Sequence, residues 1–370
     1  MKSPDRRRVP VPALPSSLTA LAVAVSDGEV PPDGLSLRES VQLLTALAGV
    51  PDPRERRGVR YSVQSVLLLA IGAVMAGKTS LVAIAGWAAR ADHQLVPIGR
   101  RPSTSTFGRV LAAVDPIAVQ RAIDRWTAAR LADAGSSPSP AGAEVMAVDG
   151  KVLRGARTAD GQVKLVAAYD QQAGLVRGQM AVQAGDEIAA LPAVLDTVGE
   201  LHGLVVTADA LHCQDSHAHW LAARGAHYVF TVMKRTRPKL HAALAAQPWG
   251  SVPGVKTVEV GHGRRESRSI KVLATDGQPA LQALFPHAAQ IAKIVRVRTR
   301  GDGKRSQETV YIVTSLTHRQ DSAGQLAGWV RGQWTIENGL HWVRDVTLSE
   351  DACQVRTGHA PTTSPPSAAW

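Results

Sequence analysis

A change in sequence pattern near residue 140 divides this chain of 370 residues into two parts that must fold differently. Before it, apolar residues recur every three or four positions in several segments, which indicates amphipathic helices. After it, short apolar runs alternate with helical segments, which is typical of a mixed α/β sheet. The stretch AGSSPSPAG at residues 134–142 lies between the two patterns and has the composition of a linker.

The first part is expected to be helical after a loose arm at residues 1–35, which is rich in proline and small residues. Ser36 is followed three residues later by Glu39, which predicts a capping box at the start of the first helix. The helices are expected at residues 36–48, 62–77, 79–89, 103–114 and 116–131.

Two of these segments, residues 79–89 and 103–114, could form a helix-turn-helix with Ser105, Thr106 and Arg109 facing DNA. The thirteen residues between them are more than a tight turn needs, which favours an ordinary helical bundle.

The second part predicts strands at residues 144–148, 163–169, 174–182, 204–207 and 228–233, and helices at 187–198, 214–223 and 323–346. Asp149 and Asp209 each close an apolar strand, so the sheet would hold their backbones while their carboxylates emerge at its edge. Glu337 lies on the long third helix.

These three carboxylates suit a metal site, because Mg²⁺ and Mn²⁺ prefer oxygen ligands. Two such ions can activate an attacking oxygen and stabilise a leaving one in phosphoryl transfer. An aspartate after a strand is also common as a turn or N-cap residue, and this alternative stays open for Asp149 and Asp209.

The excess positive charge is concentrated in one segment. The chain has 42 Lys and Arg against 31 Asp and Glu, and residues 234–305 alone contain 15 basic and 4 acidic residues. Such a surface attracts a polyanion, of which nucleic acid is the commonest. Within it, Arg296, Arg298 and Arg300 would stand ~6.7 Å apart on one face of a strand, a row that suits a phosphate backbone. The alternative is an edge strand kept charged against aggregation.

Other classes of protein and site are less well supported. The longest uncharged apolar run, residues 62–77, is shorter than the roughly 20 residues that span a bilayer, so no membrane partner is expected. His212, Cys213, His217 and His219 could bind zinc, but no second ligand pair is evident. Glu337 and His341 are four residues apart, but the HExxH pattern of metalloproteases is absent.

Three blocks of the second part resemble the signature blocks of the DDE transposases of the H-repeat-associated (ISAs) type, relatives of the larger IS-four group. They read AVDGKVLRGART, VVTADALHCQ and VRGQWTIENGLHWVRDVTLSEDACQVRTGHAP. The resemblance implies a ribonuclease-H-like core in which Asp149, Asp209 and Glu337 are the catalytic, metal-binding triad for two Mg²⁺ or Mn²⁺ ions. It also implies a β-rich insert between Asp209 and Glu337, which would be the basic segment.

Composition, sequence pattern and the resemblance together imply the following division of the chain, listed in order. Residues 1–35 are a loose arm, 36–134 a helical domain that similarly resembles the domain preceding the family's catalytic core, 135–143 a linker, 144–233 the first part of the core, 234–318 the basic insert, 319–357 the part of the core with the glutamate helix, and 358–370 an atypical tail. The tail, TTSPPSAAW, departs from the long helix expected there, and truncation or a frameshift is the expected reason.

The implied activity is metal-dependent cleavage of DNA at the ends of an insertion sequence, followed by transfer of the 3′-hydroxyl into target DNA. Arg344 follows Glu337 by seven positions, where the larger group has a basic residue, and could grip a terminal phosphate; Lys151 and Arg154 of the first block are also expected to contact DNA. The implied partners are terminal inverted repeats, target DNA and a second copy of the chain, in the cytoplasm at the nucleoid.

Two alternatives remain open. The altered tail suggests an inactive remnant that only binds DNA, and the same carboxylates could serve a nuclease without strand transfer. Two departures from the family pattern lie outside the triad: Gln333 stands where histidine is expected, and Cys353 where serine is more usual.

Overall fold

The computed structural model describes residues 35–55, 57, 59–78, 80–91, 101–133, 143–158, 161–182, 187–261, 264–342 and 345. Most of the expected arm and linker, the tail, Arg344 and Cys353 lie outside the described residues, as does the side chain of Arg154. No helix in these ranges is long and apolar enough to cross a membrane.

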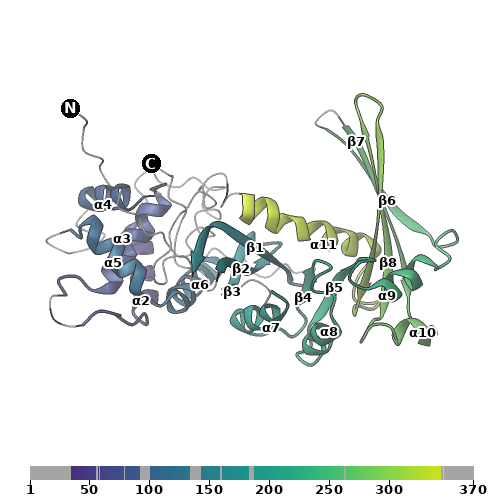
Figure 1. Ribbon diagram of the computed structural model, residues 1–370, viewed down its shortest axis with the longest axis horizontal. Helices are drawn as coiled ribbons and strands as arrows, with labels where there is room; N and C mark the ends of the chain where they lie inside the picture. The colour runs from purple at the N-terminus through teal and green to yellow at the C-terminus, as the bar shows by residue number, and fades with distance from the viewer. Residues whose placement is uncertain are drawn as a thin grey trace.

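The described part of residues 35–133 is helical (Figure 1). Its helices are α2 (Leu37–Leu47), α3 (Val63–Met75), α4 (Leu81–Arg90), α5 (Thr104–Ala113) and α6 (Pro116–Asp133). The capping box predicted at the start of α2 is present, because Ser36 accepts from the backbone of Glu39 and the Glu39 carboxylate accepts from the backbone of Ser36. These helices share one core, in which Phe107 and Trp126 are fully buried.

Nine strands form one mixed sheet in the order β3-β2-β1-β4-β5-β9-β8-β7-β6. The strands are β1 (Val145–Thr158), β2 (Gly161–Asp170), β3 (Leu175–Val182), β4 (Val205–Ala208), β5 (His227–Val232), β6 (Gly254–Gly261), β7 (Arg264–Ala274), β8 (Gln290–Arg300) and β9 (Arg305–Thr314). β4 runs parallel to β1 and to β5, and the other neighbours are antiparallel. The expected mixed α/β sheet is therefore confirmed.

Helices cover both faces of the central strands because side chains alternate along a strand. Met146 and Val148 share a core with α7 (Glu187–Val198), α8 (Asp215–Ala222) and α9 (Pro238–Ala245). On the other face, Val145 packs in a core with Leu326 of α11 (Ala323–Thr335). Asp149 continues this second series, so its side chain belongs to the face covered by α11. A short helix, α10 (Pro279–Gln282), lies between β7 and β8.

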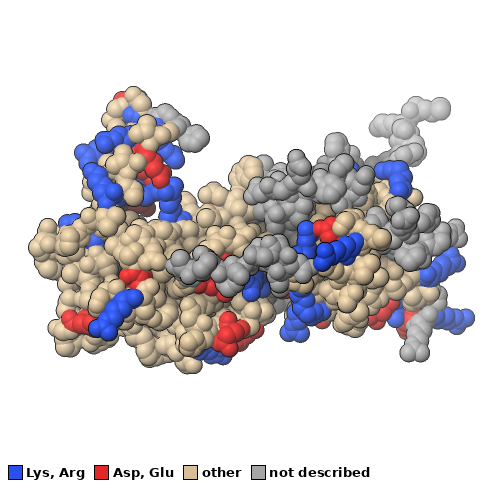
Figure 2. All heavy atoms as spheres, turned by 180° about the vertical axis from the view of Figure 1, so that it is seen from behind, with Lys and Arg blue, Asp and Glu red and all other residues tan. Residues whose placement is uncertain are grey.

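The basic segment continues the central sheet, because β9 pairs with β5. Its long strands β6 to β9 project from the body (Figure 1), and this projection is called the wing. Seen from behind, Lys and Arg gather on the wing around a small group of acidic side chains (Figure 2).

Two sequence expectations need correction. β1 does not close at Asp149 but runs on to Thr158, because β2 continues to pair with it. The helix expected at residues 323–346 is α-helical only to Thr335 and continues as a π-helix, η1 (Ile336–His341). The backbone N–H of Trp342 donates to the carbonyl of Glu337, five residues earlier, which is the π-helical pattern.

Candidate active site

Asp149 and Asp209 lie at the same level of the sheet. The last parallel pair of β1 and β4 joins Val148 to Ala208, and each aspartate is the next residue in its chain. Although β1 continues past Asp149, its neighbour β4 stops, so the sheet opens beside the aspartate on this side. Asp209 therefore follows the end of its strand, as expected, whereas Asp149 lies within β1.

Glu337 and His341 come from η1 and meet Asp149. Nδ1 of His341 lies 3.6 Å from Oδ2 of Asp149 and 3.7 Å from Oε2 of Glu337. One ligand atom from each of the three residues lies within 4.8 Å of the other two. Among the described residues, Asp149, Glu337 and His341 are the group of three potential metal ligands that lie this close together.

The carboxyl group of Asp149 sits in an unfavourable place for a charge. Burial, reinforced by the negative charges of Glu337, Asp209 and Glu187, raises the pKa of Asp149 to about 7. The side chain of Glu337 is 59% exposed, and its polar contact with His341 lowers its pKa, against the opposing effect of partial burial. The carboxylates of Asp149, Glu337 and Asp209 bring negative charge together here, an environment that a divalent cation stabilises.

Asp209 is not in the group of three. It is exposed, and its Oδ1 accepts a hydrogen bond of 2.9 Å from the backbone N–H of Leu211. This contact is the turn interaction that an aspartate after a strand commonly makes. Its charge is nevertheless close enough to contribute to the raised pKa of Asp149.

Gln333 fastens α11 to both aspartate-bearing strands. Its side-chain amide donates to the carbonyl of Val148 at 3.0 Å, and its Oε1 accepts from the hydroxyl of Thr207 on β4. Val148 directly precedes Asp149, and Glu337 follows Gln333 by four residues. The residue that departs from the family pattern therefore sets the position of α11 against the sheet.

Glycines allow this close packing. A Cβ at Gly332 would overlap the side chain of Gln171, and one at Gly339 would lie 2.6 Å from Oη of Tyr169. Gln171 is itself held, because its amide donates to Thr207 at 2.7 Å. Only residues without a side chain let α11 and η1 approach the end of β2 this closely.

The basic residues expected near the triad have different surroundings. Lys151 is buried, with 8% of its side chain exposed, and pairs with Asp345 beyond η1. Lys164 on β2 pairs with Glu187, whose carboxylate fills the space beside Gly150. Arg344 was expected on the face of Glu337 from α-helical geometry, and that premise does not hold within η1.

The arginines of the wing surround one carboxylate. Arg296 forms two hydrogen bonds with Glu266, of 2.6 and 3.0 Å, and Arg268 pairs with the same carboxylate. Nε of Arg298 lies 3.4 Å from it. Arg300 ends the row and is exposed. One buried glutamate thus holds several guanidinium groups on one face and neutralises only one positive charge.

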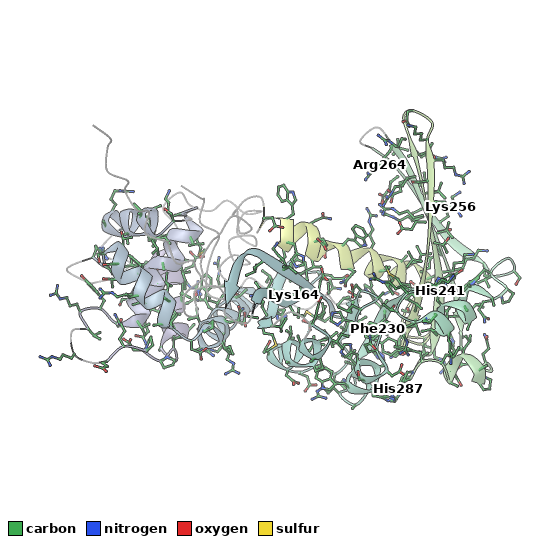
Figure 3. The ribbon with its side chains drawn as sticks, viewed as in Figure 1. Lys164, Phe230, His241, Lys256, Arg264 and His287 are labelled. Carbon is green, nitrogen blue, oxygen red and sulfur yellow. The ribbon has the colours of Figure 1, made fainter. Side chains whose placement is uncertain are left out.

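This arginine face is on the side of α11. Arg331 of α11 pairs with Glu259 of β6 at 2.5 Å, and Glu259 also lies 3.9 Å from Arg268. Arg331 precedes Glu337 by six residues, about 9 Å along a helix. Figure 3 labels Lys256 and Arg264 on the wing and Lys164 on β2, nearer the middle of the view.

The histidine cluster is not arranged for zinc. Both ring nitrogens of His217 contact backbone carbonyls, those of His212 at 3.0 Å and Ile188 at 2.8 Å. His219 is exposed and contacts His287 instead. The helix-turn-helix stays a prediction, since residues 92–100 between α4 and α5 lie outside the described part.

Sequence reasoning missed the part that His341 has in this site. Its spacing from Glu337 was visible, but nothing in the sequence placed Asp149 beside both. Trp334 and Trp342 flank Glu337 on the same helix and are 61% and 56% exposed. Unlike most tryptophans, they are not buried in a core.

The chain is similar to known proteins over most of its length. Residues 44–127 match the family described as "DDE_Tnp_1-associated", and residues 140–362 match "Transposase DDE domain". "Putative transposase YncI" of Escherichia coli O157:H7 is 28% identical over 86% of this chain and 83% of its own. "H repeat-associated putative transposase YhhI" of Escherichia coli K12 is 27% identical over 87% of each chain.

Among solved structures, 93% of the chain aligns with 66% of a chain in "Cryo-EM structure of piggyBac transposase synaptic complex with hairpin DNA". The TM-score is 0.34 at 11% identity, and the family assignment rests on the sequence matches instead.

Proposed function

Because this chain belongs to the transposase DDE domain family, we propose that it cleaves DNA at the ends of an insertion sequence and joins the freed 3′-hydroxyl to target DNA. The observation that carries the proposal is the meeting of Asp149, from the central sheet, with Glu337, from the helix packed on it. Carboxylates that converge from two rigid elements are held in place before any substrate arrives.

The donor set fits divalent cations. Asp149 and Glu337 would hold a Mg²⁺ or Mn²⁺ ion, and Asp209, at the same level of the sheet, would complete a site for two ions. The raised pKa of Asp149 supports this assignment, since burial beside other carboxylates disfavours its charged form until a cation compensates it. When bound, such ions supply charge stabilisation at the attacking and leaving oxygens of a phosphodiester.

The remaining residues of the site position these carboxylates. Gln333 ties the helix of Glu337 to the strands of both aspartates, and the pair Lys164–Glu187 fills the space behind Gly150. The strand order 3-2-1-4-5, with β4 and β5 parallel to β1, supports the proposal of a ribonuclease-H-like core over residues 144–233 and 319–357. In this division, residues 36–134 form a helical domain and residues 234–318 a basic insert.

The wing would hold the DNA. Its arginine face is next to α11 and contains the row predicted from the sequence, Arg296, Arg298 and Arg300. Glu266 holds the guanidinium groups in fixed directions, which reduces the entropy lost when phosphates bind. We further propose that two copies of the chain act on paired ends, and that Lys151, Arg154 and Arg344 lie near the scissile phosphate.

Cleavage by the purified full-length chain tests the proposal. The substrate is a duplex with the ends of the element that encodes the chain, incubated with Mg²⁺ or Mn²⁺. Asp149→Asn and Glu337→Gln should abolish cleavage, whereas Asp196→Asn, an exposed carboxylate on α7 paired with Arg224, should not. Joining of cut ends to a second DNA separates a transposase from a nuclease. Folded protein that binds the duplex without cleaving it would contradict the proposal.

A further inference from the structure

His341 is buried beside two of the candidate metal-binding carboxylates. Its side chain is 7% exposed, and its Nδ1 faces both Asp149 and Glu337. Nε2 is also buried and has no hydrogen-bond partner in the part of the chain that the structure describes. A buried polar side chain without a partner is uncommon and indicates either a ligand or a specific role.

The contacts of Nδ1 are too long to be hydrogen bonds. Both exceed 3.5 Å, whereas an N–H donor normally lies within about 3.2 Å of its acceptor. They are within reach of a shared cation. Two ligand atoms that each lie ~2.1 Å from one ion can be at most ~4.2 Å apart. The separations of 3.6 and 3.7 Å are below this limit.

The backbone holds this arrangement. Glu337 and His341 lie in one turn of η1, whose residues Ile336 and Leu340 are fully buried against Ala147 of β1 and Tyr169 of β2. Single π-helical turns of this kind occur frequently at functional sites. The imidazole therefore faces Asp149 because its neighbours are packed, and it needs no bound ion to bring it there.

As an inference that rests on the proposed function, we propose that His341 supplies a nitrogen ligand to the ion held by Asp149 and Glu337, and that this position prefers Mn²⁺ to Mg²⁺. Imidazole is a good ligand for first-row transition ions, whereas Mg²⁺ takes oxygen ligands and keeps its waters. Carboxylates provide only oxygen ligands, so the three carboxylates alone would lack the nitrogen donor on which this preference depends.

Pulsed electron paramagnetic resonance of Mn²⁺ bound to the full chain tests this inference directly. Nitrogen bonded to Mn²⁺ produces an electron spin-echo modulation, and labelling histidine with ¹⁵N changes its frequency without any substitution. The modulation should be present in the unaltered chain, change on labelling, and vanish in His341→Gln. His219→Gln, a matched control at an exposed histidine, should keep it.

Calorimetric titration gives a second readout. His341→Gln should weaken Mn²⁺ binding by about tenfold or more, the loss that removal of even an outer-shell partner causes, and weaken Mg²⁺ binding much less. Mn²⁺ that binds and depends on Asp149, but shows no nitrogen modulation, would overturn this inference and leave the proposed function intact. If neither Mn²⁺ nor Mg²⁺ binds the folded chain, both this inference and the proposed function would be overturned.

Discussion

The side-chain amide of Gln333 lies 3.0 Å from the carbonyl oxygen of Val148, the residue before Asp149. Through this bond and its contact with Thr207, one side chain joins the helix of Glu337 to the strands of both aspartates. The distance between the candidate catalytic carboxylates therefore depends on a residue that is not itself one of them.

Gln333→Ala should lower the free energy of unfolding by about 1–3 kcal/mol, because the carbonyl of Val148 loses a donor and the hydroxyl of Thr207 loses one of its partners inside the protein. Urea unfolding of the two chains measures the difference. Gln307→Ala, at an exposed position of β9, is the control and should change stability by less than about 0.5 kcal/mol. Equal effects of the two substitutions would mean that Gln333 does not fasten α11.

Gly339→Ala should destabilise the chain by about 1–3 kcal/mol, because the new Cβ would lie 2.6 Å from Oη of Tyr169 and push η1 from the sheet. Gly328→Ala in α11 is the matched control. No atom lies within 4 Å of a Cβ there, so helix propensity alone should stabilise the chain by up to about 1 kcal/mol. Thermal unfolding distinguishes the opposite signs, and a stabilising effect at Gly339 would contradict the close approach described for η1.

Divalent cations should stabilise the folded chain, since they bind the folded site and have no such site in the unfolded state. At 100 times the dissociation constant, the gain is about 2.7 kcal/mol. Mn²⁺ should raise the melting temperature, chelation should reverse the rise, and Asp149→Asn should remove it. Asp196→Asn should respond as the unaltered chain does. A rise that survives Asp149→Asn would place the stabilising ion elsewhere.

Asp124 of α6 should make stability depend on pH. Burial raises the pKa of Asp124 from 3.8 to about 7, although the hydrogen bond from Gln120 opposes the shift. The folded chain therefore binds more protons than the unfolded one between these values. The contribution of this carboxyl group is fully present below pH 3.8 and is lost as the pH rises through about 7.

In that window, Asp124→Asn should reduce the fall of stability with pH by up to about 1.4 kcal/mol per pH unit. Urea unfolding at pH 5, 6, 7 and 8 measures it, with Asp196→Asn on the exposed surface of α7 as the control. Parallel curves for the Asp124 variant and the unaltered chain would show that Asp124 does not titrate in this range.

Arg298→Ala and Arg300→Ala should each weaken binding to any DNA duplex and lower its salt dependence. Loss of one phosphate contact reduces the slope of log K against log salt by about 0.9. Arg224→Ala, which removes a guanidinium paired with Asp196 and stacked on Trp220, should leave the slope unchanged. Fluorescence anisotropy at several salt concentrations gives the slopes, and unchanged slopes for the two wing variants would assign the arginine row to protection of the sheet.

Local signals in the sequence were sufficient for much of the fold. The capping box of Ser36 and Glu39 depends on residues three apart, and the helix expected at residues 187–198 is α7 to the residue. The end of β1 could not be predicted in this way. In the sequence, Asp149 has the position of a strand end. The strand continues past it because β1 and β2 stay paired on both sides of Asp149.

The candidate site was predictable in its carboxylates but not in its geometry. Asp149 and Glu337 are 188 positions apart, and their contact depends on how α11 docks on the sheet. The same docking brings in His341 and Gln333. The π-helical turn is likewise absent from the local pattern, because it lies where Gly339 permits contact with Tyr169.

The uninterrupted sheet also has a metric consequence. Four inter-strand steps separate β1, which carries Asp149, from β8, which carries the arginine row. At about 4.8 Å per step, the two strands lie about 19 Å apart across the sheet. The pairings carry Val148 across to Ile291 of β8, so Arg296 also lies four residues, about 13 Å, further along the strands than Asp149. Because hydrogen-bonded strands keep their spacing, the sheet fixes both parts of the separation between the carboxylates and the arginine row. Longer loops would leave this separation unchanged, whereas the loss of one strand would remove one step across the sheet.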